Sequence, residues 1–285
     1  MVEEGRTALQ AAGVPEPLRD AEVLLAFVLG VETSGLHARP DRLVEAPVAS
    51  RYRDLVARRA ARQPLQYLTG VQEFWSLAFK VTPAVLIPRP ETEGLIEAFL
   101  RLCESADPVV LDIGTGSGCL AVTVAREIPR ARVFAGDLSE EALGVARENA
   151  AAHGVAARIE FRRGDLFGPF RGSGPGPDLS ARADFILTNP PYLGDGEFPA
   201  LMPEVRDHEP RAALSAGPDP LAVHRRLARE CGDFLRPGGY LIAEMGLGQE
   251  AALRALYGGQ PRLEVTAVHA DLAGIPRVLV VRARG

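Results

Sequence analysis

The most informative segment of this 285-residue chain reads Asp112-Ile113-Gly114-Thr115-Gly116-Ser117-Gly118. A short apolar run, 109–113, precedes the glycines, and a helix pattern over 119–127 follows them directly. Glycines at such a strand-to-helix turn let the backbone approach a ligand closely. The spacing is GxGxG and differs from the dinucleotide fingerprint GxGxxG, because Gly118 stands two positions after Gly116. For this segment alone, a tight turn without a ligand is an equal alternative.

Strand and helix signals alternate on the C-terminal side of this segment. Further strands are expected at 132–135, 159–161, 185–188, 240–244, 264–268 and 278–282, and a helix capped by Ser139 is expected to run to about 152. This alternation predicts an α/β fold with a mostly parallel sheet covered by helices on both faces. The last two strands have no helix between them, so we expect an antiparallel pair at one edge.

Three acidic residues stand at the ends of three successive predicted strands. Asp112 can organise the glycine loop or favour the ammonium and sulfonium region of a bound amino-acid derivative. Asp137 can accept both hydroxyls of a ribose, as the acid of the dinucleotide enzymes does. Asp165 can accept from an adenine amino group, with Leu166 beside the ring. These acids favour S-adenosylmethionine over NAD, whose phosphates would face carboxylates with no basic residue near them.

The fourth predicted strand ends in Thr188-Asn189-Pro190-Pro191-Tyr192. The two prolines fix φ and remove two backbone donors, which leaves carbonyl oxygens such as that of Pro190 free to face a ligand. Asn189 adds a side-chain acceptor, and Tyr192 adds a flat aromatic wall, so the segment suits a planar –NH2 group. We expect Asn189 to orient such a group without acting as a base. The alternative is a proline-stiffened strand exit with Tyr192 packed in the core.

The N-terminal residues, 1 to about 65, follow a helical pattern. A third helix is expected over 48–62, with Leu55 and Val56 facing inward and the arginines on the solvent side, namely Arg51, Arg53, Arg58, Arg59 and Arg62. Residues 1–80 hold ten Lys/Arg and ten Asp/Glu, a balance that gives nucleic acid no electrostatic attraction. A hairpin with a turn near Ser76 is expected to follow.

Composition narrows the class of protein further. The net charge of −5 excludes a chain-wide attraction to nucleic acid. No apolar run approaches the roughly 20 residues of a membrane helix, and the N-terminal residues do not resemble a signal peptide. The three cysteines form no CxxC pair and the histidines show no ligand spacing, so no metal site is expected. We therefore expect a cytoplasmic protein, and we predict separately that it is a monomer.

With these residues in view, the chain resembles the HemK-type release-factor glutamine methyltransferases over nearly its whole length. The resemblance rests on these segments: 63–70, with Phe74 and Phe79 after it; 86–93, which contains Pro88-Arg89-Pro90-Glu91-Thr92-Glu93; Asp112–Gly118; the tetrad Asn189–Tyr192; Glu209-Pro210-Arg211; and Glu244-Met245-Gly246 with Gln249. It implies a class I methyltransferase fold with a seven-stranded sheet and an antiparallel edge strand. It also implies an N-terminal helical docking domain at 1–68, a hairpin linker at 69–84 and a catalytic domain at 85–285.

The resemblance also implies a substrate and a set of site residues. The substrate would be the glutamine of the Gly-Gly-Gln loop in class I release factors, methylated on its amide nitrogen, with S-adenosylhomocysteine as second product. Gly114–Gly118, Asp137 and Leu166 would line the cofactor, and Asn189 would touch both cofactor and glutamine. Arg89 and Glu91 would order the entrance, or alternatively form a structural ion pair or helix cap. Glu244 would support the site or be a satisfied buried carboxylate.

Three other functions stay open on the sequence alone. A ribosomal-protein glutamine methyltransferase would use the same tetrad and the same chemistry. An adenine-N6 methyltransferase would flip a base into the site, and should show a basic cleft. A non-catalytic cofactor-binding module would have little need for Asn189 and Tyr192 beside the methyl donor.

Overall fold

The computed structural model describes residues 1–38, 43–172 and 176–285. These residues divide into two compact units. The first holds Met1–Val71 together with Leu201–His208, and the second holds Gln72–Ala200 and Glu209–Gly285. The first unit thus includes a segment that leaves the second unit and returns to it, a feature that the sequence did not indicate. None of the described helices is long and apolar enough to cross a membrane.

The first unit is helical, as expected. Its helices are α1 (Val2–Ala11), α2 (Pro17–Leu29), α3 (Thr33–Ala38), α4 (Ala46–Ala60), α5 (Leu65–Thr69) and, from the returning segment, α9 (Pro203–His208). Gly30 ends α2 with φ of 65°, a left-handed conformation that side chains with a Cβ resist. The core of the unit contains Leu9, Leu24, Tyr52 and Leu55.

One expectation for the arginine-rich helix was wrong. Arg59 does not lie on the solvent side, because it is only 5% exposed. Its guanidinium donates to Asp20 of α2 at 2.8 Å and to Glu204 of α9 at 2.9 Å. Arg62 also donates to both carboxylate oxygens of Glu204. The sequence of α4 alone gives no sign that Arg59 is buried, because its two acidic partners come from α2 and α9.

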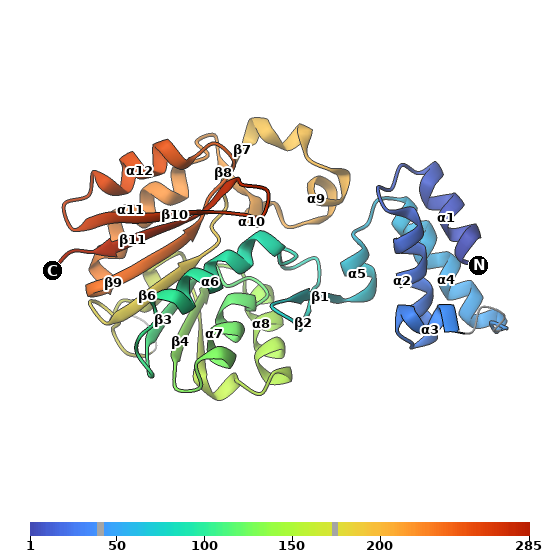
Figure 1. Cartoon of the computed structure of the whole chain (residues 1–285), viewed down its shortest axis with the longest axis horizontal. Coiled ribbons are helices and arrows are strands. Elements are labelled where there is room, and N and C mark those ends of the chain that lie inside the picture. The colour runs from blue at the N-terminus through green and yellow to red at the C-terminus, as the bar shows by residue number, and fades with distance from the viewer. Residues whose placement is uncertain (39–42, 173–175) are drawn as a thin grey trace. The chain divides into compact units, whose positions relative to one another are not determined.

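The second unit is built around a seven-stranded sheet in the order β10-β11-β9-β6-β3-β4-β5 (Figure 1). The strands are β3 (Val109–Ile113), β4 (Arg132–Asp137), β5 (Ile159–Arg163), β6 (Ala183–Thr188), β9 (Leu235–Glu244), β10 (Leu263–Ala270) and β11 (Pro276–Ala283). β11 runs antiparallel to both β9 and the edge strand β10, which confirms the antiparallel pair. The chain proceeds outward from β3 through β4 to β5, then crosses to β6 on the other side of β3.

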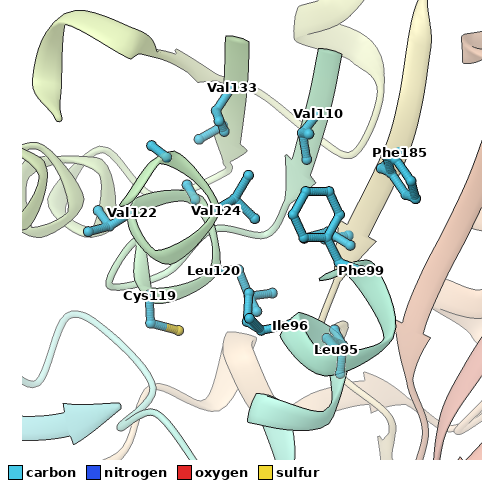
Figure 2. Close-up of a cluster of buried hydrophobic side chains, with 14 of the residues drawn as sticks. Leu95, Ile96, Phe99, Val110, Cys119, Leu120, Val122, Val124, Val133 and Phe185 are labelled. Carbon is cyan, nitrogen blue, oxygen red and sulfur yellow. The ribbon is translucent and has the colours of Figure 1, made fainter. Parts of the chain in front are cut away.

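Helices cover both faces of this sheet, because adjacent strand residues point to opposite sides. On one face lie α6 (Glu93–Leu102), α7 (Cys119–Glu127) and α8 (Glu140–Ala152), and on the other lie α11 (Ala222–Phe234) and α12 (Glu250–Gly258). Figure 2 shows the first face, where Phe99 of α6 lies near Val110 and Phe185. The rings of Phe99 and Phe185 meet edge to face at 4.9 Å.

Shorter elements complete the chain. The expected hairpin is formed by β1 (Val71–Phe74) and β2 (Leu77–Lys80), joined by Trp75 and Ser76 at φ of 54° and 56°. Two successive positive φ angles are typical of a type I′ turn. A small two-stranded sheet pairs β7 (Leu193–Gly194) with β8 (Ser215–Gly217), and α10 (Arg211–Leu214) precedes β8.

Candidate active site

The glycine loop follows the central strand β3, at the point where the strand order reverses. Its backbone is tied to the neighbouring strand, since the amides of Gly114 and Thr115 both donate to the Gly136 carbonyl at 2.9 Å. Gly114 and Gly116 have φ of 74° and 54°, and a Cβ built on either would meet no protein atom within 4 Å. The loop therefore presents open backbone at the position where open α/β sheets bind their ligands.

Asp112 lies beneath this loop with no exposed surface. Its Oδ2 accepts from the Thr115 hydroxyl at 2.6 Å and from the Ala121 amide at 3.2 Å. Its Oδ1 is buried without a hydrogen-bond partner among the described side chains and backbone. Burial raises the pKa of Asp112 to about 7, and these two hydrogen bonds only partly offset it. The carboxyl group of Asp112 therefore supports the glycine loop from below.

Asp137, at the end of β4, holds the loop from the other side. Its Oδ2 accepts from the Gly116 amide and its Oδ1 from the Ser139 amide, both at 2.9 Å. The residue is half-buried. A carboxylate oxygen can accept two hydrogen bonds, so each oxygen keeps a lone pair for a ribose hydroxyl. Asp137 therefore lies at the strand end where it was expected, and its carboxylate suits the ribose of a nucleoside.

Asp165 and Leu166 follow the end of β5. The Asp165 side chain is exposed and forms an ion pair of 2.6 Å with Arg226 of α11. The expectation that no basic residue stands near the three strand-end acids was therefore wrong. Nothing local signals this pair, because 61 residues separate the two side chains. Leu166 has φ of 45°, an uncommon backbone conformation for a residue with a Cβ.

The last part of the loop is fixed by packing and by one asparagine. Gly118, with φ of 81°, allows α8 to approach, since a Cβ there would lie 3.0 Å from the Cβ of Ala146. The Asn149 amide donates to the Ser117 carbonyl at 2.8 Å and pairs with both backbone groups of Lys80. Asn149 thus ties the hairpin to the loop, a role that the sequence did not predict.

The tetrad Asn189–Tyr192 begins beside the glycine loop, because β6 pairs with β3 in parallel and Thr188 lies opposite Ile113. The Thr188 hydroxyl donates to the Ile113 carbonyl at 2.8 Å. The Asn189 amide nitrogen donates to the Thr92 hydroxyl at 3.1 Å, and that hydroxyl donates to Glu244 at 2.6 Å. The residue that follows β3 and the residue that follows β6 therefore share one edge of the sheet.

Tyr192 is anchored at both its hydroxyl and its backbone. Its hydroxyl donates to Glu244 at 3.2 Å, and its carbonyl accepts from the Gln249 side chain at 3.0 Å. Burial and the neighbouring Glu244 carboxylate raise the pKa of Tyr192, so the phenol stays neutral. A Cβ at Gly246 would lie 3.0 Å from both Tyr192 and Gln249, so these side chains would have to shift to admit one. Pro190 is buried and Pro191 half-buried.

Arg89 and Glu91 differ in their surroundings. Arg89 forms an ion pair with Glu209, whose other oxygen accepts from the Ile87 amide at 3.2 Å. Glu91 is exposed within the 3-10 turn Pro90–Thr92. The structure therefore places Arg89 in the ion pair that was its alternative interpretation. Among the described residues, no group of three His, Cys, Asp or Glu side chains could hold a metal ion.

The strand order and the open glycine loop at its reversal define a class I S-adenosylmethionine-dependent methyltransferase. Two family models match the chain: the PrmC N-terminal domain over residues 1–70 and the methyltransferase small domain over residues 92–202. The structure of a methyltransferase from Pyrococcus furiosus is similar, with a TM-score of 0.53 and 17% identity, covering 74% of this chain and 91% of that one.

Curated relatives match nearly the whole chain. The release factor glutamine methyltransferase of Koribacter versatilis is 42% identical, covering 96% of this chain and 94% of the relative. That of Cereibacter sphaeroides is 44% identical, with the same coverage of both chains. The chain belongs to the family of release factor glutamine methyltransferases. The fold class and the cofactor expected from the sequence are thereby confirmed.

Proposed function

We propose that this chain methylates the side-chain amide nitrogen (N5) of the glutamine in the Gly-Gly-Gln loop of class I peptide chain release factors. The observation that carries the proposal is the register of β3 and β6. It brings the glycine loop, which suits the cofactor, beside Asn189 and Tyr192, which suit a planar amide. The choice of substrate is supported by the curated release factor glutamine methyltransferases, which are 42% and 44% identical to this chain over 96% of its length.

The residues would hold S-adenosylmethionine through the loop and the strand-end acids. Gly114–Gly118 would give it open backbone, and Asp112 would organise that loop from below. Asp137 would face its ribose, and Asp165 with Leu166 its adenine. When bound, S-adenosylmethionine supplies a sulfonium methyl group as the electrophile. The open space at Gly114 and Gly116 fits such a ligand.

The tetrad would prepare the substrate nitrogen. An amide nitrogen is a poor nucleophile, because its lone pair is delocalised into the carbonyl group. The Asn189 side-chain carbonyl and the Pro190 backbone carbonyl would each accept one amide hydrogen, and Tyr192 would cover the amide plane. Both acceptors favour the positive charge that develops on nitrogen. A nitrogen–carbon bond forms as the sulfur–carbon bond breaks, and the amide then loses a proton to water.

The test is methyl transfer from labelled S-adenosylmethionine to a purified release factor. The control is the same factor with its Gly-Gly-Gln glutamine changed to alanine. Label that enters only the unmodified factor supports donor and acceptor together. Label in both factors, or in neither, contradicts the assignment. Asn189→Ala should lower incorporation about 100-fold or more, by analogy with the loss of one electrostatic contact to a transition state; undiminished incorporation contradicts its role.

We also propose where the enzyme acts, its oligomeric state and the kind of partner it recognises. We propose a cytoplasmic monomer that recognises protein and not nucleic acid, because residues 1–80 are neutral and the net charge is negative. Sedimentation should give the mass of one chain. Binding to RNA that weakens steeply with salt would instead favour the adenine-N6 alternative.

A further inference from the structure

Four polar side chains form a continuous chain of hydrogen bonds behind the tetrad. The Thr92 hydroxyl lies between the Asn189 amide nitrogen at 3.1 Å and the Glu244 carboxylate at 2.6 Å. The second oxygen of Glu244 accepts from the Tyr192 hydroxyl at 3.2 Å. Thr92 and Glu244 are each only 2% exposed, so the hydrogen bond between them is shielded from water, whereas Asn189 and Tyr192 are half-buried. They come from three places: the start of α6, the strand exit of β6 and the end of β9.

The direction of each hydrogen bond in this chain follows from one group. Both hydroxyls that reach Glu244 donate to it, Thr92 to one oxygen and Tyr192 to the other. Burial raises the pKa of Glu244, and these two hydrogen bonds oppose that rise because they favour the ionised carboxylate, which only accepts. A hydroxyl has one hydrogen, and Thr92 can then only accept from Asn189. The Asn189 amide must therefore turn its nitrogen to Thr92, and its carbonyl oxygen faces the other way.

This direction matters for the proposed chemistry. A substrate –NH2 group carries two donors and needs acceptors. An Asn189 amide rotated by half a turn would present its own –NH2 to that group, and two donors repel each other. An asparagine without a fixed partner can adopt either orientation, because its two ends have nearly the same shape.

We propose that Thr92 and Glu244 are positioning residues that fix the orientation of the Asn189 amide, so that its carbonyl oxygen is presented to the substrate amide. The inference rests on the proposed function and deepens it. Glu244 accepts from Thr92 and Tyr192 at once, and so holds both polar residues of the tetrad with a single carboxylate. A glutamine at position 244 would carry an –NH2 group in place of one carboxylate oxygen. That group could donate to the Thr92 hydroxyl, which could then donate to Asn189, so the Asn189 amide could turn around.

Three variants separate this role from a merely structural one. Thr92→Val removes the hydroxyl at nearly constant volume and should lower kcat about 10- to 100-fold, while KM for the release factor changes less than about threefold. Thr92→Ser restores the hydroxyl and should keep kcat within about threefold of the native value. Glu244→Gln should lower kcat about tenfold, because only part of the variant molecules would keep the native direction of the hydrogen bonds from Asn189 through Thr92.

The chain offers a matched control. Thr123 of α7 is also fully buried, and its hydroxyl has no partner among the described residues. Thr123→Val should leave kcat and KM unchanged. If Thr92→Val and Thr123→Val behave alike, the proposal fails.

A second readout needs neither cofactor nor substrate. The chain contains only two asparagines, Asn149 and Asn189, so protein labelled with ¹⁵N-asparagine gives two side-chain amide signals. The Asn149 amide donates to Ser117 and Lys80 and serves as an internal reference. In Thr92→Val, hydrogen exchange at the Asn189 amide should accelerate about tenfold or more while that at Asn149 stays constant. An unchanged Asn189 signal would overturn the proposal.

A wrong substrate and a wrong role for Thr92 would give different experimental results. If the native enzyme does not methylate the release factor, the proposed substrate is wrong, but the amide signals still test the positioning role. If the native enzyme is active and Thr92→Val retains its kcat, the positioning role is wrong and the proposed function stands.

Discussion

Thr115 donates a 2.6 Å hydrogen bond to Oδ2 of Asp112, and this bond holds the glycine loop over a carboxyl group that has no contact with solvent. Burial raises the pKa of Asp112 from its ordinary 3.8 to about 7. Between these values the folded protein keeps a proton that the unfolded chain has lost. Stability therefore falls as pH rises through this window, because the folded state binds more protons.

Asp112→Asn keeps the shape of the side chain and its hydrogen bond from Thr115, but it cannot ionise. The free energy of unfolding of the native protein should fall by a few kcal/mol relative to this variant as pH rises from about 4 to about 7. Urea unfolding across that range measures the difference. An Asp107→Asn variant, changed at an exposed position of the loop before β3, should follow the native curve. Parallel curves for native and Asp112→Asn would refute the buried proton.

Glu204 connects α9 to two arginines of the first unit. Glu204→Ala would take a carboxylate partner from the buried Arg59, which would keep Asp20 and the Gln63 carbonyl. The loss of a partner from a buried ion pair costs about 3–5 kcal/mol. We expect a loss of that order in the first unit, measured by calorimetry. The matched surface pair is Arg53 with Glu4, both more than half exposed. Glu4→Ala should cost less than about 1 kcal/mol, and equal losses would contradict the assignment.

Asn149 should matter for both stability and cofactor affinity. Asn149→Ala removes the three hydrogen bonds of a buried side chain. It should lower the free energy of unfolding by about 2–3 kcal/mol. Because the Ser117 carbonyl loses its partner, S-adenosylmethionine should also bind more weakly in titration calorimetry. Glu148→Ala, which removes only a surface pair with Lys80, is the control. A variant with native affinity would show that the loop does not depend on Asn149.

Two glycines of neighbouring elements should respond in opposite ways to alanine. Gly118→Ala places a Cβ against Ala146 at a residue with φ of 81°, so we expect a loss of about 1–3 kcal/mol and weaker cofactor binding. Gly144 lies within α8 with nothing within 4 Å of a built Cβ, so Gly144→Ala should stabilise by about 0.5–1 kcal/mol. Melting curves check both, and a stabilising Gly118→Ala would be the contrary result.

Much of the site could be predicted because its signals are local. The glycines after β3, Asp137 after β4 and the tetrad after β6 each stand next to an apolar strand, and parallel strands bring their carboxyl ends to one edge. The hairpin turn at Ser76 was located in the same way. The domain boundaries at 68 and 84 and the contacts of Asp165 and Leu166 with adenine stay predictions.

The sequence by itself determined which residues form strands and which strand ends carry polar groups, since both depend on neighbours along the chain. Only the tertiary structure decided which polar side chains pair. Thr92 and Glu244 lie 152 residues apart, and Arg59 and Glu204 lie 145 apart. A hydrogen bond requires its two atoms to lie about 3 Å from each other. Burial then decides whether the pair matters, because an unpaired polar group costs most where water cannot replace its partner.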